Sequence, residues 1–224
     1  MHGPLATATP GRPHVVAHLG QSLDGRIATA GGASHYVNGS ASLDHLHRLR
    51  ALADAVVVGA ATVALDDPRL TTRRVAGDNP VRVVLDRGCG LPATRRVFSD
   101  GLAPTLRVCA AERCRGADGP SAEVLGMAGW TDGVPAGAVL AALAARGLHC
   151  VLVEGGGVTV SQFLRQGALH RLQLALAPML IGSGRPAITL PEISDLADAL
   201  RPQCRTYPLG SDVLFDCRFA AGTG

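Results

Sequence analysis

Short apolar runs recur along the chain and alternate with amphipathic or alanine-rich segments. Residues 14–19 (HVVAHL) predict a first strand, and similar runs return at residues 54–59, 81–86, 105–110 and 149–154. Most of these runs are bounded by glycine, proline or aspartate, the residues that commonly form turns. Such short apolar runs are typical of strands that are buried on both faces of a parallel sheet.

Helical patterns lie between these runs. Residues 40–53 carry a leucine at every third position, which roughly follows one helical face, and Ser40 or Ser42 is the candidate cap. Residues 135–146 are rich in alanine and begin with a proline, and residues 158–166 follow three glycines. Both segments predict helices.

The C-terminal part has a different pattern, with strands that have few helices between them. These strands are predicted at residues 171–177, 203–208 and 212–219, and the last two are close enough for a hairpin. The whole pattern predicts an α/β fold with a mixed, mostly parallel sheet, helices on both faces and an antiparallel C-terminal edge. We expect residues 13–220 to form a single domain after a flexible tail at residues 1–12.

Composition limits both the core and the class of function. Hydrophobic residues make up 47% of the chain but aromatic residues only 3%, so the core must be aliphatic. The net charge of +3 comes with scattered arginines, whereas a nucleic-acid binder usually shows a basic stripe with stacking aromatics. No apolar run approaches the length of a membrane span. Because all 21 basic residues are arginine, lysine Schiff-base and P-loop chemistry are excluded.

The cysteines and the N-terminus indicate a cytoplasmic protein. No C-x-x-C pair and no histidine at zinc spacing is present, so we expect no metal site. The first residues have no apolar stretch of the kind found in signal peptides. We therefore expect reduced thiols at all six cysteines, which are Cys89, Cys109, Cys114, Cys150, Cys204 and Cys217.

Candidate chemistry lies where the predicted strands end, because open parallel sheets bind ligands at the carboxyl ends of their strands. Glu154 ends one strand, and Gly155, Gly156 and Gly157 lead into a helix. The glycines either let the backbone approach a phosphate at the helix start or form a turn that needs positive φ. Asp66 belongs to an Asp-Asp-Pro sequence that either stops a helix or places two carboxylates at a site.

Other polar residues have two interpretations each. His18 lies among apolar residues of the first strand, as either a core histidine or a site residue. Arg50 and Arg73 would bind phosphate if the fold brought them together. His45 and His47 are two residues apart, so they do not share a helix face and do not indicate a metal site.

Eight segments, in order and at fitting spacing, resemble a known family. It is the reductase domain of the bifunctional riboflavin-biosynthesis deaminase/reductase, in the dihydrofolate-reductase-like superfamily. The segments are HLGQSLDGRIA at 18–28, SHY at 34–36, LRA at 49–51, DAVVVGAATV at 54–63, DDPRLTTR at 66–73, VRVVLD at 81–86, VLVEGGG at 151–157 and APMLIG at 177–182. The resemblance runs from about residue 12 to 219.

The resemblance implies a homodimeric, NADPH-dependent reductase with a dihydrofolate-reductase-like fold. Such an enzyme reduces the ribosylamino group of a phosphorylated pyrimidine to a ribitylamino group. The implied substrate residues are Ser34, Arg50, Leu70, Arg73 and Glu154, with the two arginines at the ribose phosphate. The implied cofactor residues are Gly20, Tyr36, Thr62, Asp66 and the loop Gly155, Gly156, Gly157, Val158, Thr159, Val160, Ser161 and Gln162. We add Arg87, after the strand at 81–86, as a candidate for the cofactor's 2′-phosphate, and His18 and Asp66 as the candidate catalytic residues.

Three departures from the family pattern leave alternatives open. His18 stands where the family commonly has lysine, and Tyr36 stands where it usually has tryptophan. No H-x-E with P-C-x-x-C marks a zinc deaminase, so a stand-alone reductase is expected. The first hypothesis is the riboflavin-pathway reductase. The second is a reductase of the same fold for another imine, pterin or pyrimidine-like ring, and the third is a catalytically silent dinucleotide-binding protein.

Overall fold

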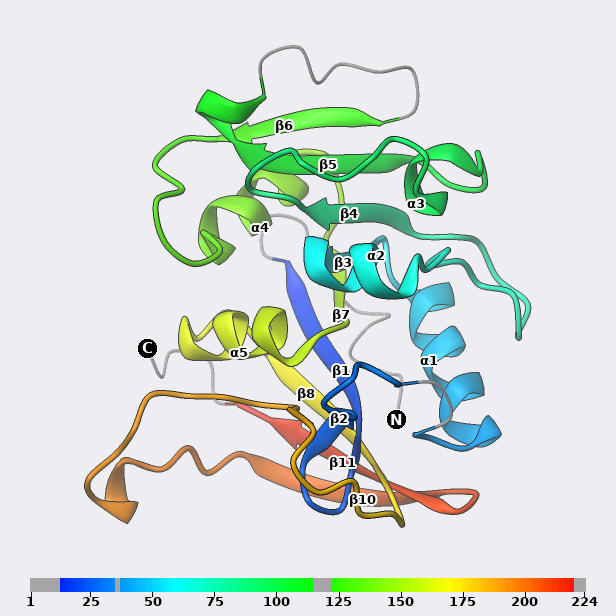
Figure 1. The fold of residues 1–224 in the computed structure, drawn as a ribbon, viewed down its shortest axis with the longest axis vertical. Coiled ribbons are helices and arrows are strands. Elements are labelled where there is room, and N and C mark those ends of the chain that lie inside the picture. The colour runs from blue at the N-terminus through cyan, green and yellow to red at the C-terminus, as the bar shows by residue number, and fades with distance from the viewer. Residues whose placement is uncertain (1–12, 35–36, 115–121, 220–224) are drawn as a thin grey trace.

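A mixed sheet forms the centre of the molecule (Figure 1). The computed structural model describes residues 13–34, 37–114 and 122–219; the expected tail at residues 1–12 lies outside them. Within the described residues the main sheet has nine strands in the order β10-β11-β8-β1-β7-β3-β4-β5-β6. The strands are β1 (His14–Ser22), β3 (Ala55–Gly59), β4 (Val81–Leu85), β5 (Thr105–Ala110), β6 (Glu123–Met127), β7 (Cys150–Glu154), β8 (Arg171–Ala177), β10 (Gln203–Leu209) and β11 (Asp212–Arg218).

The strand directions confirm the predicted architecture. All neighbouring strands from β8 to β6 pair in parallel, while β11 pairs antiparallel with both β8 and β10. β10 and β11 are the hairpin predicted from the C-terminal pattern. Because most strands are parallel, their carboxyl ends lie along one edge of the sheet.

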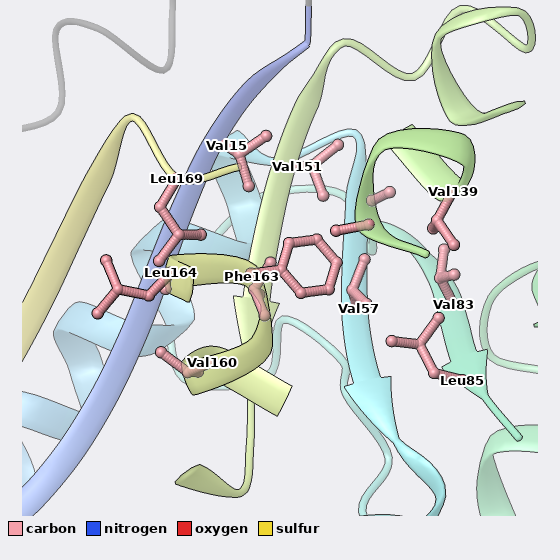
Figure 2. Close-up of a cluster of buried hydrophobic side chains, with 14 of the residues drawn as sticks. Val15, Val57, Val83, Leu85, Val139, Val151, Val160, Phe163, Leu164 and Leu169 are labelled. Atoms are coloured by element: carbon pink, nitrogen blue, oxygen red, sulfur yellow. The ribbon is translucent and has the colours of Figure 1, made fainter. Parts of the chain in front are cut away.

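Helices cover both faces, as expected, and each face has its own apolar core. One face carries α1 (Ser40–Leu52), α2 (Ala60–Asp66) and the short α3 (Arg96–Ser99), and the other carries α4 (Ala136–Ala144) and α5 (Gly157–Arg165). In the larger core, Phe163 of α5 lies among aliphatic side chains such as Val57 and Val151 (Figure 2). No helix in the described part of the chain is both long and apolar enough to cross a membrane.

The start of α1 is fixed by a residue far away in the sequence. The Asp212 carboxylate of β11 accepts hydrogen bonds from the Gly39 amide (2.8 Å) and the Ser42 hydroxyl (2.7 Å). Ser40 and Ser42 therefore do not cap the helix as predicted, since Gly39 is the N-cap residue and makes no side-chain cap bond. This contact sets the position of α1 against the sheet.

Several short elements were not predicted. β6 is an edge strand with mixed burial, and α3 is a single turn, so neither has a readable pattern. β2 (Arg26–Ala28) pairs with β9 (Arg185–Pro186), which lies far along the chain. Two 3₁₀ turns, η2 (Ala111–Arg113) and η3 (Leu196–Asp198), complete the elements.

The expectation of six reduced thiols is wrong for one pair. Cys109, at the end of β5, forms a disulfide with Cys114. The η2 turn reverses the chain between them, which brings Cys114 back against the strand. The other four cysteines are free, and the Sγ atoms of Cys204 and Cys217 lie 3.0 Å apart across the β10–β11 hairpin.

Candidate active site

Two helix starts meet at the carboxyl ends of β3 and β7. The Gly156 amide, just before α5, donates a hydrogen bond to the Thr62 hydroxyl of α2 (3.0 Å). A Cβ atom on Gly59 would lie 2.5 Å from the hydroxyl oxygen of Thr159, so α5 also closes against the end of β3. The glycine loop and the start of α2 thus form one contiguous surface.

The glycines of this loop meet different steric demands. Gly155 has φ of 110°, which confirms the positive-φ turn, and a Cβ there would lie 3.1 Å from side-chain atoms of Thr62 and Val58. A Cβ on Gly157 would lie 2.2 Å from the carbonyl oxygen of Ala187, because the chain after β9 crosses the start of α5. The loop therefore needs glycine for its own conformation, while phosphate binding there stays a prediction.

A buried ion pair lies directly beside the glycine loop. Arg50 of α1 donates from Nε to Oε1 of Glu154 (2.7 Å) and from Nη2 to Oε2 (2.6 Å). Its remaining nitrogen, Nη1, donates to the carbonyl oxygen of Thr71 (3.1 Å). Burial alone would lower the pKa of Arg50, but the Glu154 carboxylate outweighs burial, and the pKa is raised. Two residues that we expected to contact the substrate separately are bound to each other.

Further arginines gather at the outer side of this pair. Arg73 is exposed, and its backbone amide donates to Nδ1 of the buried His47 (3.1 Å). Partial burial, followed by the charges of Arg50 and Arg69, lowers the pKa of Arg73. Leu70, between the two outer arginines, is buried with φ of 55°, a left-handed conformation that is rare for leucine. The segment at residues 69–73 thus holds the guanidinium groups of Arg69 and Arg73 near each other, at a strained turn.

His18 lies beside the Arg50–Glu154 pair, on the face of the sheet that α1 covers. In the sheet register, His18 is the neighbour of Glu154 on β7 and of Gln173 on β8. It is 7% exposed, and its Nε2 atom has no hydrogen-bond partner among the described residues. Burial, then the proximity of His45 and Arg50, lowers the pKa of His18 to about 3. His18 is therefore neutral at physiological pH and borders the ion pair.

Other predicted residues are not brought into this cluster by any contact. Asp66 is exposed at the end of α2, and Arg87 is exposed after β4. Gly20 is covered by Asn38, whose side chain would collide with a Cβ at that position. Ser34 is half-buried. Tyr36 lies outside the described residues.

The sequence reading missed residues that support the site. Gln173 accepts a hydrogen bond at Oε1 from the His45 ring (2.7 Å) in a buried contact between β8 and α1. A signal for Gln173 was present, since it is an amide within an otherwise apolar stretch of its strand. The carbonyl of Thr71 had no such signal, because its role depends on a tertiary contact with Arg50.

Comparisons with known proteins agree with this architecture. Residues 13–214 match the family described as the RibD C-terminal domain. The 2,5-diamino-6-ribosylamino-4(3H)-pyrimidinone 5′-phosphate reductase of Methanothermobacter thermautotrophicus is 37% identical, over 92% of this chain and 97% of that protein. The riboflavin biosynthesis protein RibD of Mycobacterium tuberculosis is 34% identical, over 91% of this chain but only 54% of its own length.

Solved structures give the same result. The deaminase/reductase of Thermotoga maritima, a diaminohydroxyphosphoribosylaminopyrimidine deaminase and 5-amino-6-(5-phosphoribosylamino)uracil reductase, superposes with a TM-score of 0.80 at 29% identity. The match covers 92% of this chain and 56% of that one, so the chain spans about half the length of such two-function relatives. The matched segment and the sequence identities together show that the chain belongs to the RibD C-terminal domain family.

Proposed function

We propose that this protein is an NADPH-dependent reductase that acts on a ribosylamino-pyrimidine 5′-phosphate in riboflavin biosynthesis. The observation that carries the proposal is the direct succession of Glu154 and Gly155. Glu154 is held in a buried ion pair, and its carboxylate could accept hydrogen bonds from a heterocycle. Gly155 begins the glycine loop, which could bind the phosphates of a dinucleotide. Hydride transfer requires the two ligands to lie side by side, and this succession supplies adjacent sites.

The glycine loop and α2 fit a dinucleotide. Gly155 and Gly156 have no side chains, so a ligand could approach their backbone beside Thr62. The start of α5 directs its amide groups and the positive end of its dipole toward this part of the loop. Bound NADPH would supply the hydride, and the glycine loop together with α5 as far as Gln162 would border its phosphates. Arg87 remains our candidate for the 2′-phosphate, and Asp66 for a polar contact to the cofactor.

The polar layer under α1 fits a phosphorylated pyrimidine. Arg50 takes one lone pair on each Glu154 oxygen, so the carboxylate keeps acceptor capacity for the N–H groups of a heterocycle. Arg73 and Arg69 are exposed, and no acidic side chain of the described residues pairs with them. We assign the phosphate to these outer arginines, while Arg50 orients Glu154. Ser34 and Leu70 would border the ribose.

His18 would take part as a neutral imidazole. With its pKa lowered to about 3, it holds no ring charge at physiological pH, so it would offer a hydrogen bond to the reacting group. A lysine at this position would instead place a charge in the same layer. This difference favours a second candidate, a reductase of the same fold with a different imine or pyrimidine-like substrate.

We extend the proposal to the state of the protein in the cell. The family resemblance and the absence of a membrane-spanning helix in the described part support a cytoplasmic enzyme. We propose a homodimer, in line with the resemblance, and gel filtration with light scattering would test this assembly.

Steady-state assays test the proposed function. Purified protein is supplied with NADPH or NADH and with the ribosylamino-pyrimidine phosphate, a pterin or a cyclic imine, alongside the His18→Lys variant. The proposal predicts turnover of the pyrimidine phosphate by the natural protein. Turnover of only another ring would support the second candidate. Tight NADPH binding without turnover of any substrate would support a silent binding protein.

A further inference from the structure

A continuous layer of buried polar side chains runs beneath α1 from the antiparallel edge to the candidate site. Asp216 of β11 forms a bidentate ion pair with Arg171 of β8. Gln173 donates from Nε2 to Oδ1 of Asp216 (3.5 Å), and its Oε1 lies 2.7 Å from Nε2 of His45. The His45 ring lies 5.9 Å from the His18 ring, centroid to centroid, with a tilt of 50°. The layer therefore ends on a residue of the site.

The chemistry of this layer fixes the proton on His45. Both oxygens of the Asp216 carboxylate accept from the Arg171 guanidinium, and Oδ1 also accepts from the Gln173 amide, which turns its NH₂ group toward it. Gln173 then presents its carbonyl oxygen to His45, which must donate from Nε2. His45 is thereby held with a proton on Nε2.

The surroundings of His18 make it sensitive to this arrangement. It faces His45 and Arg50 from α1, Glu154 from β7 and Gln173 from β8. Glu154 is already paired with Arg50, so no unpaired carboxylate among these neighbours stabilises a positive charge on His18. His45 is 0% exposed and belongs to the helix that also supplies Arg50. A change at His45 therefore alters the wall against which the His18 ring packs.

We propose that His45 is a positioning residue, held by Gln173, Asp216 and Arg171, which keeps the His18 imidazole in one orientation beside Glu154. The proposal rests on the proposed function only for the claim that His18 contacts substrate. His45 itself does not contact the reacting atoms. It acts through His18, so its loss should have little further effect when His18 is already absent.

Nuclear magnetic resonance tests the positioning without any activity. Long-range proton–nitrogen spectra report the tautomer of each imidazole, and loss of signals in His18→Gln assigns His18. We expect His18 to show one neutral tautomer that does not titrate between pH 7.5 and 5. In His45→Asn we expect a mixture of tautomers, and Gln173→Met, which keeps the His45 side chain but removes its hydrogen-bond acceptor, should change His18 in the same direction. Unchanged His18 spectra in both folded variants would overturn the proposal.

A double-mutant cycle on turnover adds the functional side. His45→Asn should lower kcat severalfold with little change in NADPH affinity, and the double variant with His18→Gln should be no slower than His18→Gln alone. Multiplicative losses would overturn the positioning role. His14→Asn is the matched control, since His14 is a half-buried histidine at the opposite end of β1, packed on His170. An inactive natural protein with the predicted spectra would refute the proposed function but leave the His45–His18 relationship standing.

Discussion

Arg50 and Glu154 are bound to each other through two hydrogen bonds of 2.7 and 2.6 Å, although 104 positions separate them in the chain. The pair joins α1 to the last residue of β7 and is almost completely buried. It therefore links the stability of the fold to the position of the carboxylate beside the glycine loop.

Removal of one partner of this pair should be costly. Glu154→Gln leaves the Arg50 guanidinium buried without its counter-charge, and we expect the free energy of unfolding to fall by about 3–5 kcal/mol. The Glu123→Gln variant is the control, because the Arg146–Glu123 pair is largely solvent-exposed and should contribute less than about 1 kcal/mol. Urea titrations of both variants measure the difference. Equal losses would show that the buried pair contributes no more than a surface pair.

Arg73 provides a cleaner test of phosphate binding than Arg50 does. Arg50→Ala removes the ion pair and disturbs Glu154, so an increased KM would have two causes. Arg73→Ala should raise the KM for the phosphorylated substrate about 10-fold or more and leave the Kd for NADPH unchanged. An exposed arginine on the edge strand, Arg205, serves as the matched alanine control. An unchanged KM in Arg73→Ala would remove this residue from the phosphate site.

The start of α5 should not tolerate a side chain. In Gly157→Ala, the new Cβ would collide with the carbonyl oxygens of Ala187 and Pro186, at 2.2 and 2.5 Å. We expect a loss of about 1–3 kcal/mol of stability together with weaker NADPH binding. Gly137→Ala, in the open part of α4, should instead stabilise the protein by up to about 1 kcal/mol. Thermal melts and NADPH titrations distinguish the two, and equivalent behaviour would contradict the packing described here.

Buried neutral histidines predict a loss of stability in mild acid. The pKa of His18 is lowered to about 3 and that of His47 to about 4, mainly by burial, against a usual value near 6.5. Between these values the unfolded chain binds protons that the folded protein does not. Stability is therefore complete above about pH 6.5 and falls as the pH drops, by about 1.4 kcal/mol per pH unit for His18 alone, with His47 acting in the same direction.

Urea midpoints at pH 7.5, 6 and 5 measure this dependence. The His18→Gln variant should show a shallower decline, because one of the titrating groups is gone. A decline as steep as that of the natural protein would mean that other groups control the acid sensitivity.

Much of the sheet was predictable because buried parallel strands are nearly continuous apolar runs. The run predicted at residues 105–110 is β5 without change, and the run at 54–59 is β3 within one residue. β6 was not predictable, since an edge strand with mixed burial lacks that pattern. The Cys109–Cys114 disulfide was also missed, because a turn that the sequence does not mark brings the two residues together.

The arrangement of the candidate residues could not be predicted from the sequence. Strand ends and the family resemblance identified Arg50 and Glu154 separately, but only the fold shows that they pair. The spacing of His45 and His47 along the sequence shows only that they do not form a metal site. It carries no information about which strand of the sheet His45 contacts. Its contact with Gln173 depends on the register of β8 against β1. Long-range register of this kind is set by tertiary packing.

The most direct test of the central claim follows the hydride itself. Purified protein is mixed with the ribosylamino-pyrimidine 5′-phosphate and with NADPH that carries deuterium at the reactive carbon of the nicotinamide, and the product is analysed by mass spectrometry. The account predicts a ribitylamino product that has gained the deuterium, with slower transfer in His18→Gln. Recovery of the unreduced pyrimidine phosphate, with the labelled cofactor intact, would contradict it.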